Sequence, residues 1–251
     1  MSNTTPIKRS LTTAAFVLAS LSLAQTTKGA DVDVTSGGKV YKSYLAAPSG
    51  EGKKPAVVLL HSFNGMEQGY KDLVDEMANA GYVTLALGWQ TFEKQPSDAV
   101  VQALVADGLK QLEGRADVDI NRVGLTGFCA GGRYTMLLLP QIKQFKAGVA
   151  WYGFPNGGGA DSATQPKPPA DFIGQLSTPM MIIHGTKDQA SSIASIYEYA
   201  NKLDTAGKNF KLDVYQGEPH GFLLSEGKIA DTFASRDARQ AMLAYFGANL
   251  N

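Results

Sequence analysis

The strongest fold signal in the chain is the segment NRVGLTGFCAGG, which occupies residues 121–132. Residues 123–126 have the apolar composition of a short strand, and residues 130–139 have that of a helix ending before Pro140. A G-x-C-x-G turn centred on Cys129 joins the two. Glycines on both sides of a residue permit a turn too tight for larger side chains. The segment therefore predicts a strand–turn–helix unit with Cys129 exposed above a sheet.

On both sides of this unit, strands alternate with helices along the chain. Further strands are expected at residues 39–47, 55–61, 82–87, 147–152, 179–184 and 210–215, and further helices at 66–80, 98–112, 191–203 and 230–246. Val- and Leu-rich runs such as 55–61 are typical of strands buried on both faces of a parallel sheet. This pattern predicts a doubly wound, mostly parallel α/β sheet with helices on both faces, and with residues 39–47 at an edge.

Residues 156–169, NGGGADSATQPKPP, are rich in glycine and proline and lack periodicity. Strand–helix alternation resumes after them, so we interpret them as an excursion between two strands and not as a domain linker. Residues 31–251 are therefore predicted to form a single domain.

The composition excludes several functional classes. The 251 residues include 23 basic and 23 acidic side chains, a balance that argues against a nucleic-acid partner. A single cysteine excludes an intramolecular disulfide and a cysteine-rich zinc site. No two of the three histidines have the spacing of a metal motif, so neither a metal nor a cofactor is expected. No oligomeric state is predicted.

The first 30 residues have the features of a signal peptide. Lys8 and Arg9 precede a 14-residue uncharged stretch, residues 11–24, and small residues follow it. Such a stretch is too short to span a bilayer comfortably, and a short helix docked on the domain is the alternative. We expect cleavage near Ala24 or Ala30 and export to the periplasm or the medium. The mature chain would have no membrane span, 20 basic and 23 acidic side chains.

The G-x-C-x-G turn matches a nucleophile elbow in which cysteine takes the usual place of serine. A helix N-terminus at this point favours a thiolate and offers N–H groups to an oxyanion. The alternative is an inert core cysteine. The backbone N–H groups of Ala130 and of Phe63, in the loop after the strand 55–61, are the candidate oxyanion hole.

A thiol nucleophile needs a base and an acid that orients it. Downstream of Cys129, Asp188 follows the strand 179–184, and His220 follows the strand 210–215, so both lie where α/β sheets bind ligands. Alternatively, Asp188 only caps the next helix. His184 is expected to be a structural hydrogen-bonding residue, and His61 to shape the site without acting as base.

Four motifs carry a resemblance to a known family, namely GFCAGGR (127–133), WYG (151–153), HGTKD (184–188) and PHGF (219–222). With them the chain, over about residues 56–247, resembles the dienelactone hydrolase family of the α/β-hydrolase superfamily. The resemblance implies an α/β-hydrolase fold and cofactor-free hydrolysis of an enol-lactone or related ester. It also implies a triad of Cys129 as nucleophile, His220 as base and Asp188 as orienting acid.

The chain departs from the family in its expected substrate pocket, for which the candidates are Ser62, Trp89, Tyr152 and Phe222. Ser62 stands where the family has a glutamate, and residues 88–90 and 222–224 lack the family's substrate-binding arginines. Arg133 is expected to point away from the site. The sequence thus predicts a hydrolase of small uncharged esters or lactones. The alternatives are a catalytically silent binding protein, and a peptidase or acyltransferase on the same fold.

Overall fold

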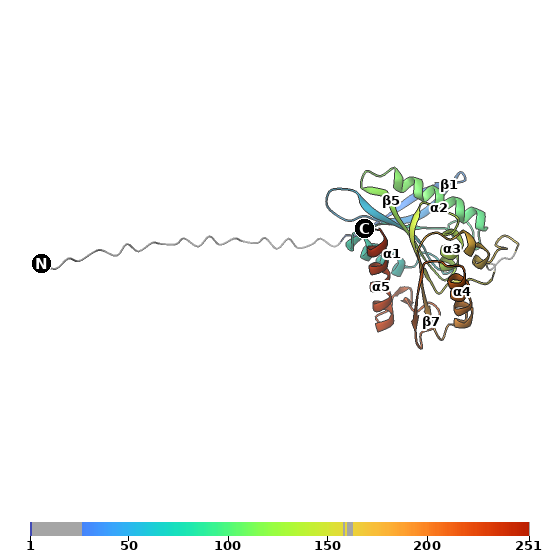
Figure 1. Cartoon of the computed structure of the whole chain (residues 1–251). Coiled ribbons are helices and arrows are strands. Elements are labelled where there is room, and N and C mark those ends of the chain that lie inside the picture. Colours follow the sequence, from blue (N-terminus) through green and yellow to red (C-terminus); the bar gives the residue numbers. More distant parts are fainter. Residues whose placement is uncertain (2–26, 158, 160–162, 251) are drawn as a thin grey trace.

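The chain folds around one central sheet, which Figure 1 shows with helices on its two sides. The computed structural model describes residue 1 and residues 27–157, 159 and 163–250. The strands of the main sheet are β1 (Ala30–Ser36), β2 (Lys39–Ala46), β3 (Lys54–Leu60), β4 (Val83–Leu87), β5 (Val118–Phe128), β6 (Phe145–Trp151), β7 (Met180–Gly185) and β8 (Phe210–Tyr215). The α-helices are α1 (Gln68–Asn79), α2 (Asp98–Glu113), α3 (Ala130–Leu138), α4 (Ile193–Thr205) and α5 (Phe233–Leu250).

Three short elements complete the described fold. They are the 3₁₀ helix η1 (Pro169–Gln175) and the hairpin strands β9 (Leu224–Ser225) and β10 (Lys228–Ile229). The main sheet has the strand order β1-β2-β4-β3-β5-β6-β7-β8. β2 is antiparallel to both its neighbours, and all later pairs are parallel.

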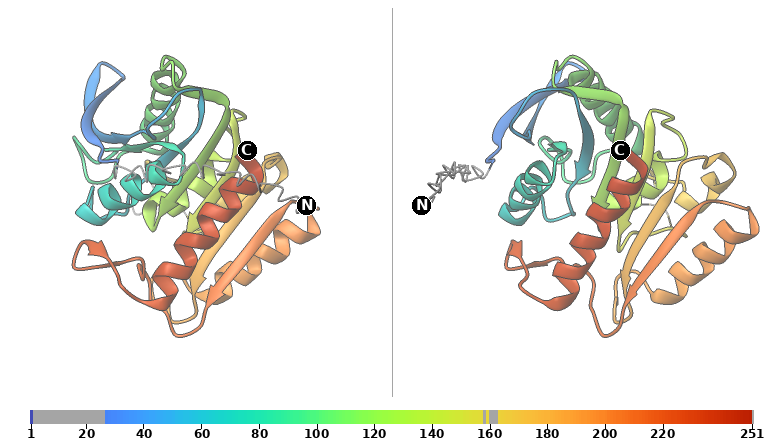
Figure 2. Two further views of the ribbon diagram at one scale, coloured as in Figure 1. Left: turned by 90° about the vertical axis from the view of Figure 1, so that its left-hand side faces the viewer. Right: turned by 60° about the vertical axis from the view of Figure 1, so that its left-hand side comes forward.

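The helices form two layers because the buried strands are apolar on both faces. Along β3, Val57 and Leu59 pack in a cluster with α1 and α5, whereas Val58 and Leu60 pack in a second cluster with α2, α3 and α4. Figure 2 shows α5 crossing one face of the sheet, with α4 on the other. The prediction of a doubly wound, mostly parallel sheet with helices on both faces is confirmed.

The predicted edge strand was wrong. β2 pairs with both β1 and β4, and β1 forms the edge, with Ala30 opposite Leu45. Only Val34 and Ser36 of β1 are buried, and its aspartates point outward, which hid the strand among polar residues. Residues just before β1 also join the fold, because the Gly29 N–H donates to the buried Asp75 at 2.7 Å.

The predicted start of helix α4 differs from the observed start by two residues. The helix expected from residue 191 begins at Ile193, because the Ser192 hydroxyl caps it by accepting from the Ser195 N–H at 3.3 Å.

Among the described residues, no helix combines the length and apolarity needed to cross a membrane. The predicted signal peptide lies, up to residue 26, outside the described residues.

The parallel strands bring distant loops to a single edge of the sheet. β3, β5, β6, β7 and β8 run in the same direction, so the loops that follow them meet at their carboxyl ends. The loops after β5, β7 and β8 carry Cys129, Asp188 and His220.

Candidate active site

Cys129 occupies a strained turn between β5 and α3. Its φ of 57° and ψ of −113° lie outside the regions that L residues usually adopt. A Cβ at Gly127 would collide with the carbonyl of Gly131, and a Cβ at Gly131 would collide with that of Leu60. Both glycines are therefore needed for the turn, as the sequence predicted.

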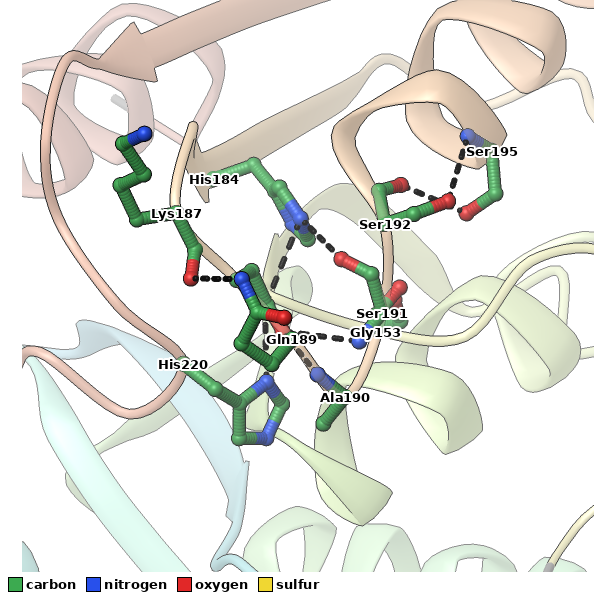
Figure 3. A network of polar contacts seen from close by, with 10 residues as sticks. Gly153, His184, Lys187, Gln189, Ala190, Ser191, Ser192, Ser195 and His220 are labelled. Carbon is green, nitrogen blue, oxygen red and sulfur yellow. Dashed lines mark hydrogen bonds and ion pairs between the residues drawn. The ribbon is translucent and has the colours of Figure 1, made fainter.

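Asp188 and His220 form a direct hydrogen bond. His220 Nδ1 lies 2.7 Å from Asp188 Oδ2 (Figure 3). The other oxygen, Oδ1, accepts the backbone N–H groups of Ala190 at 2.9 Å and Ser191 at 2.7 Å. Asp188 thus caps the turn before α4 and orients His220 at the same time, so the two interpretations offered by the sequence are not exclusive.

Electrostatics favour a charged pair of acid and base. Burial opposes the charge on His220, but the hydrogen bond to Asp188 and the interaction with Cys129 outweigh it and raise the pKa of His220 to about 9. Burial also opposes the charge on Asp188, yet hydrogen bonds from His220 and the Ser191 N–H lower the pKa of Asp188. At neutral pH this favours an imidazolium on an ionised carboxylate, next to Cys129.

A cavity of about 800 Å³ opens beside these groups and includes both Cys129 and His220 in its wall. The candidate oxyanion residues, Phe63 and Ala130, line it as well. Ala130 is the first residue of α3, where the backbone N–H has no intrahelical acceptor. Six aromatic residues contribute to the wall, namely Phe63, Tyr70, Trp89, Tyr134, Tyr152 and Phe154.

Three of the four predicted pocket residues line this cavity, namely Ser62, Trp89 and Tyr152. Phe222 does not. It is buried behind the wall, with its ring centroid 5.7 Å from that of Tyr152. The expectation for Phe222 was wrong because its side chain packs into the core below the loop that carries His220.

Tyr152 shapes the site directly after β6. Its φ of 36° is unusual for a residue with a side chain, and the residue is almost fully buried. Its ring meets that of His220 edge-on at 5.1 Å, while the Phe154 ring lies 5.5 Å from His220 on a tilt. The His220 ring is therefore held between aromatic rings as well as by Asp188.

Charged residues that the sequence analysis did not place in the pocket also line the cavity, namely Glu67, Lys94, Arg133 and Glu226. The expectation that Arg133 points away was wrong. Its guanidinium binds both oxygens of Asp98, at 2.7 and 3.0 Å, and the carbonyl of Lys167 at 3.0 Å. Glu67 lies in the loop after β3, at the sheet edge that carries the site, and this position in the sequence could have predicted that it lines the cavity.

The other two histidines lie beside the site. His61, fully buried at the end of β3, contacts the Ser62 carbonyl through Nδ1 at 2.7 Å and stacks on Trp89 at 5.0 Å. Burial lowers the pKa of His61 to about 4, which makes it a poor base. His184 Nε2 lies 2.8 Å from the Ser191 carbonyl, in the structural role expected. Within the described residues, no group of three or more potential ligands could hold a metal.

The parallel sheet, the Cys129 turn and the loops that carry Asp188 and His220 together define the α/β-hydrolase class. Residues 41–250 match the sequence profile of the dienelactone hydrolase family. The chain belongs to this family and is a carboxylic ester hydrolase.

Individual relatives agree with this assignment. A Methylorubrum extorquens protein assigned as a carboxymethylenebutenolidase is 29% identical over 248 residues, covering 88% of this chain and 84% of the relative. A Bradyrhizobium protein assigned as a 2-oxo-3-(5-oxofuran-2-ylidene)propanoate lactonase is 28% identical over 208 residues, covering 76% and 82%. A crystal structure assigned as a dienelactone hydrolase, from Klebsiella pneumoniae, superposes with a TM-score of 0.79 at 26% identity, covering 88% of this chain and 98% of the other.

Proposed function

We propose that this protein hydrolyses small uncharged esters or lactones through a Cys129–His220–Asp188 triad and a covalent acyl-enzyme. The observation that carries the proposal is the 2.7 Å bond between His220 and Asp188, in a cavity wall shared with Cys129. The Asp188 carboxylate fixes the ring of His220, so its other nitrogen is free to exchange a proton with substrate and water.

Acylation begins from a thiolate and an imidazolium. The Cys129 sulfur forms a bond to the carbonyl carbon, and the carbonyl oxygen becomes an oxyanion that the N–H groups of Phe63 and Ala130 stabilise. The carbon–oxygen bond to the leaving group then breaks. The leaving alkoxide takes the proton of His220 Nε2, and a thioester and a neutral imidazole remain.

Deacylation reverses these roles. Neutral His220 takes a proton from water, whose oxygen attacks the thioester carbon at the same oxyanion position. The carbon–sulfur bond breaks, and the Cys129 thiolate and the His220 imidazolium are restored. The carboxylic acid product loses its proton to solvent.

The charges around the cavity support an uncharged substrate. Asp98 neutralises Arg133, and among the described residues of the wall Glu67 and Glu226 outnumber Lys94, the one further cation besides the His220 imidazolium. A buried substrate carboxylate would need an unpaired cation. The lactonase and butenolidase assignments of the relatives support a lactone as readily as an open-chain ester.

A panel of esters and lactones assayed with wild-type protein and with Cys129→Ala tests this proposal. We expect turnover by the wild type alone, and complete inactivation by one iodoacetamide label, because the chain has a single cysteine. Binding without turnover would support a silent binding protein. Turnover that depends on an added alcohol or amine acceptor would support an acyltransferase, and cleavage of peptides in preference to esters a peptidase.

We further propose export, with cleavage nearer Ala24 than Ala30. Cleavage after Ala30 would remove the first residue of β1 and the Lys28 ion pair with the buried Asp75, at 3.2 Å. The N-terminal sequence of the protein recovered from the cell envelope tests this. Recovery with Met1 intact in the cytosol would contradict export.

A further inference from the structure

His184 is a buried ionisable residue that the proposed reaction does not use. It lies in β7, and its side chain is inaccessible to solvent. Nε2 lies 2.8 Å from the Ser191 carbonyl and 3.4 Å from Asp188 Oδ2, the same oxygen that binds His220 (Figure 3). Asp188 therefore has a histidine on each side.

The contact with Ser191 fixes the tautomer of His184. A backbone carbonyl only accepts hydrogen bonds, so Nε2 carries the proton. Burial lowers the pKa of His184, so the ring is neutral at working pH and Nδ1 is unprotonated. Asp188 and His220 are the ionisable groups that interact with it. The neutral ring thus donates its single N–H to the Ser191 carbonyl, and it adds no positive charge beside Asp188 that would compete with His220.

Asp188 is surrounded by four N–H groups. Two backbone groups, of Ala190 and Ser191, bind Oδ1, and the rings of His220 and His184 contact Oδ2. An ionised carboxylate offers about four acceptor positions, so the hydrogen bonds from Ala190, Ser191 and His220 fill most of them, while the Nε2–H of His184 is donated to Ser191. Of the two groups at Oδ2, His184 comes from the core and cannot move with the loop that carries His220.

Ser191 ties this arrangement to the segment that follows β6. Its carbonyl accepts from His184, its N–H donates to Asp188, and its hydroxyl donates to the Gly153 carbonyl at 2.7 Å. Gly153 directly follows Tyr152, whose ring packs against His220. Movement of His184 would therefore disturb both supports of the base.

We propose that His184 is a positioning residue, whose Nε2–H holds the Ser191 carbonyl and, through the Ser191 N–H, holds Asp188 so that Oδ2 stays in line with His220 Nδ1. The proposal rests on the catalytic role assigned to His220 and Asp188 under the proposed function. His184 makes no contact with the reacting atoms in this account and acts only through the acid.

Three variants of the full-length protein test this role. His184→Phe keeps the ring and removes the donor. His184→Gln places an amide N–H near the position of Nε2, and His184→Asn has an amide too short to reach it. We expect a loss of about tenfold or more in kcat for His184→Phe and His184→Asn with KM nearly unchanged, and substantial recovery in His184→Gln.

A substrate-independent readout separates this proposal from the proposed function. The low-field NMR resonance of His220 Nδ1–H reports its bond to Asp188. It should weaken in His184→Phe and His184→Asn, while the pKa of His220 falls from about 9 towards 6.5, and His184→Gln should retain both properties. Tyr199→Phe, which alters another buried side chain packed beside β7, is the control and should change neither.

An unchanged His220 resonance and pKa in folded His184→Phe or His184→Asn would overturn the positioning role. If His184→Phe fails to fold, the comparison of His184→Asn with His184→Gln decides the question. The same His220 resonance and the same His220 pKa in these two variants would contradict the proposal. Failure of the proposed function has a different signature, because Cys129→Ala would then remain active whatever the His220 resonance shows.

Discussion

At the scale of single residues, the turn that carries Cys129 depends on the absence of a side chain at Gly127 and at Gly131. Cys129 has backbone angles that cost free energy, and the two glycines let the surrounding backbone come close enough to hold them. This feature was predictable from sequence, because a local spacing encodes it. The place of Arg133 in the cavity wall was not predictable, because its partner Asp98 lies 35 residues earlier and no local sequence pattern joins the two.

Gly131→Ala should destabilise the protein by about 3 kcal/mol, because the new methyl group meets the backbone carbonyl of Leu60. Gly174→Ala is the matched control, since a Cβ there has no neighbour within 4 Å and should leave stability nearly unchanged. Urea unfolding of both variants measures the difference. Equal stabilities would contradict the close packing of the turn.

The activity should fall at alkaline pH with an apparent pKa near 9. His220 must carry a proton to protonate the leaving group, and its hydrogen bond to Asp188 and its interaction with Cys129 raise its pKa to about 9 against the effect of burial. In Asp188→Asn the loss of activity should move to lower pH. The profile of kcat/KM against pH measures the apparent pKa of the alkaline decline in the wild type and in the variant. An alkaline decline that Asp188→Asn leaves unchanged would contradict the assignment of His220 as the proton donor.

At the scale of elements, continuous apolar runs were the most predictable. β3, β4 and β7 are buried along almost their whole length, and their sequences show it directly. β1 was missed because only one of its faces is buried, and the β9–β10 hairpin because it has two residues per strand. Both depend on pairing with other segments more than on their own composition.

His61, which directly follows β3, should make the free energy of unfolding fall in acid. Its folded-state pKa is about 4, against a usual value of 6.5, so between these values the unfolded chain binds a proton that the folded one does not. Stability is therefore fully present above pH 6.5 and falls by about 3 kcal/mol as the pH decreases to 4. His184, whose pKa is also lowered by burial, acts in the same direction.

Urea unfolding at about pH 7 and about pH 4.5 measures this effect. His61→Phe should be less stable at the higher pH but lose much less on acidification, because it removes the titrating ring. Below pH 6 His220 contributes almost no slope, because its raised pKa makes its contribution nearly complete there. An unchanged pH dependence in His61→Phe would contradict the argument.

At the scale of the whole molecule, the cavity combines side chains from loops far apart in the sequence. Glu67 follows β3, Lys94 precedes α2 and Glu226 comes from the β9–β10 hairpin. The sequence predicted which sheet edge carries the site, because parallel strands force their carboxyl ends together. It did not predict the charge of the cavity, which depends on side chains meeting across that edge.

The cavity charge predicts a preference for uncharged lactones over anionic ones of about tenfold in kcat/KM. Lys94→Gln should leave turnover of the uncharged lactone unchanged, because Lys94 is exposed and lies over the Phe63 ring at 4.8 Å. Paired assays of a lactone and its carboxylate-bearing analogue at neutral pH measure the preference. Faster turnover of the anionic lactone, lost in Lys94→Gln, would contradict it.

The covalent intermediate on Cys129 is the central claim. Its most direct test is intact-protein and peptide mass spectrometry after rapid acid quenching of wild-type protein with an ester that deacylates slowly. We predict one added acyl group per chain, carried by the peptide containing Cys129, and none in Cys129→Ala. Steady-state hydrolysis with no adduct, or an adduct on another residue that persists in active Cys129→Ala, would contradict the account.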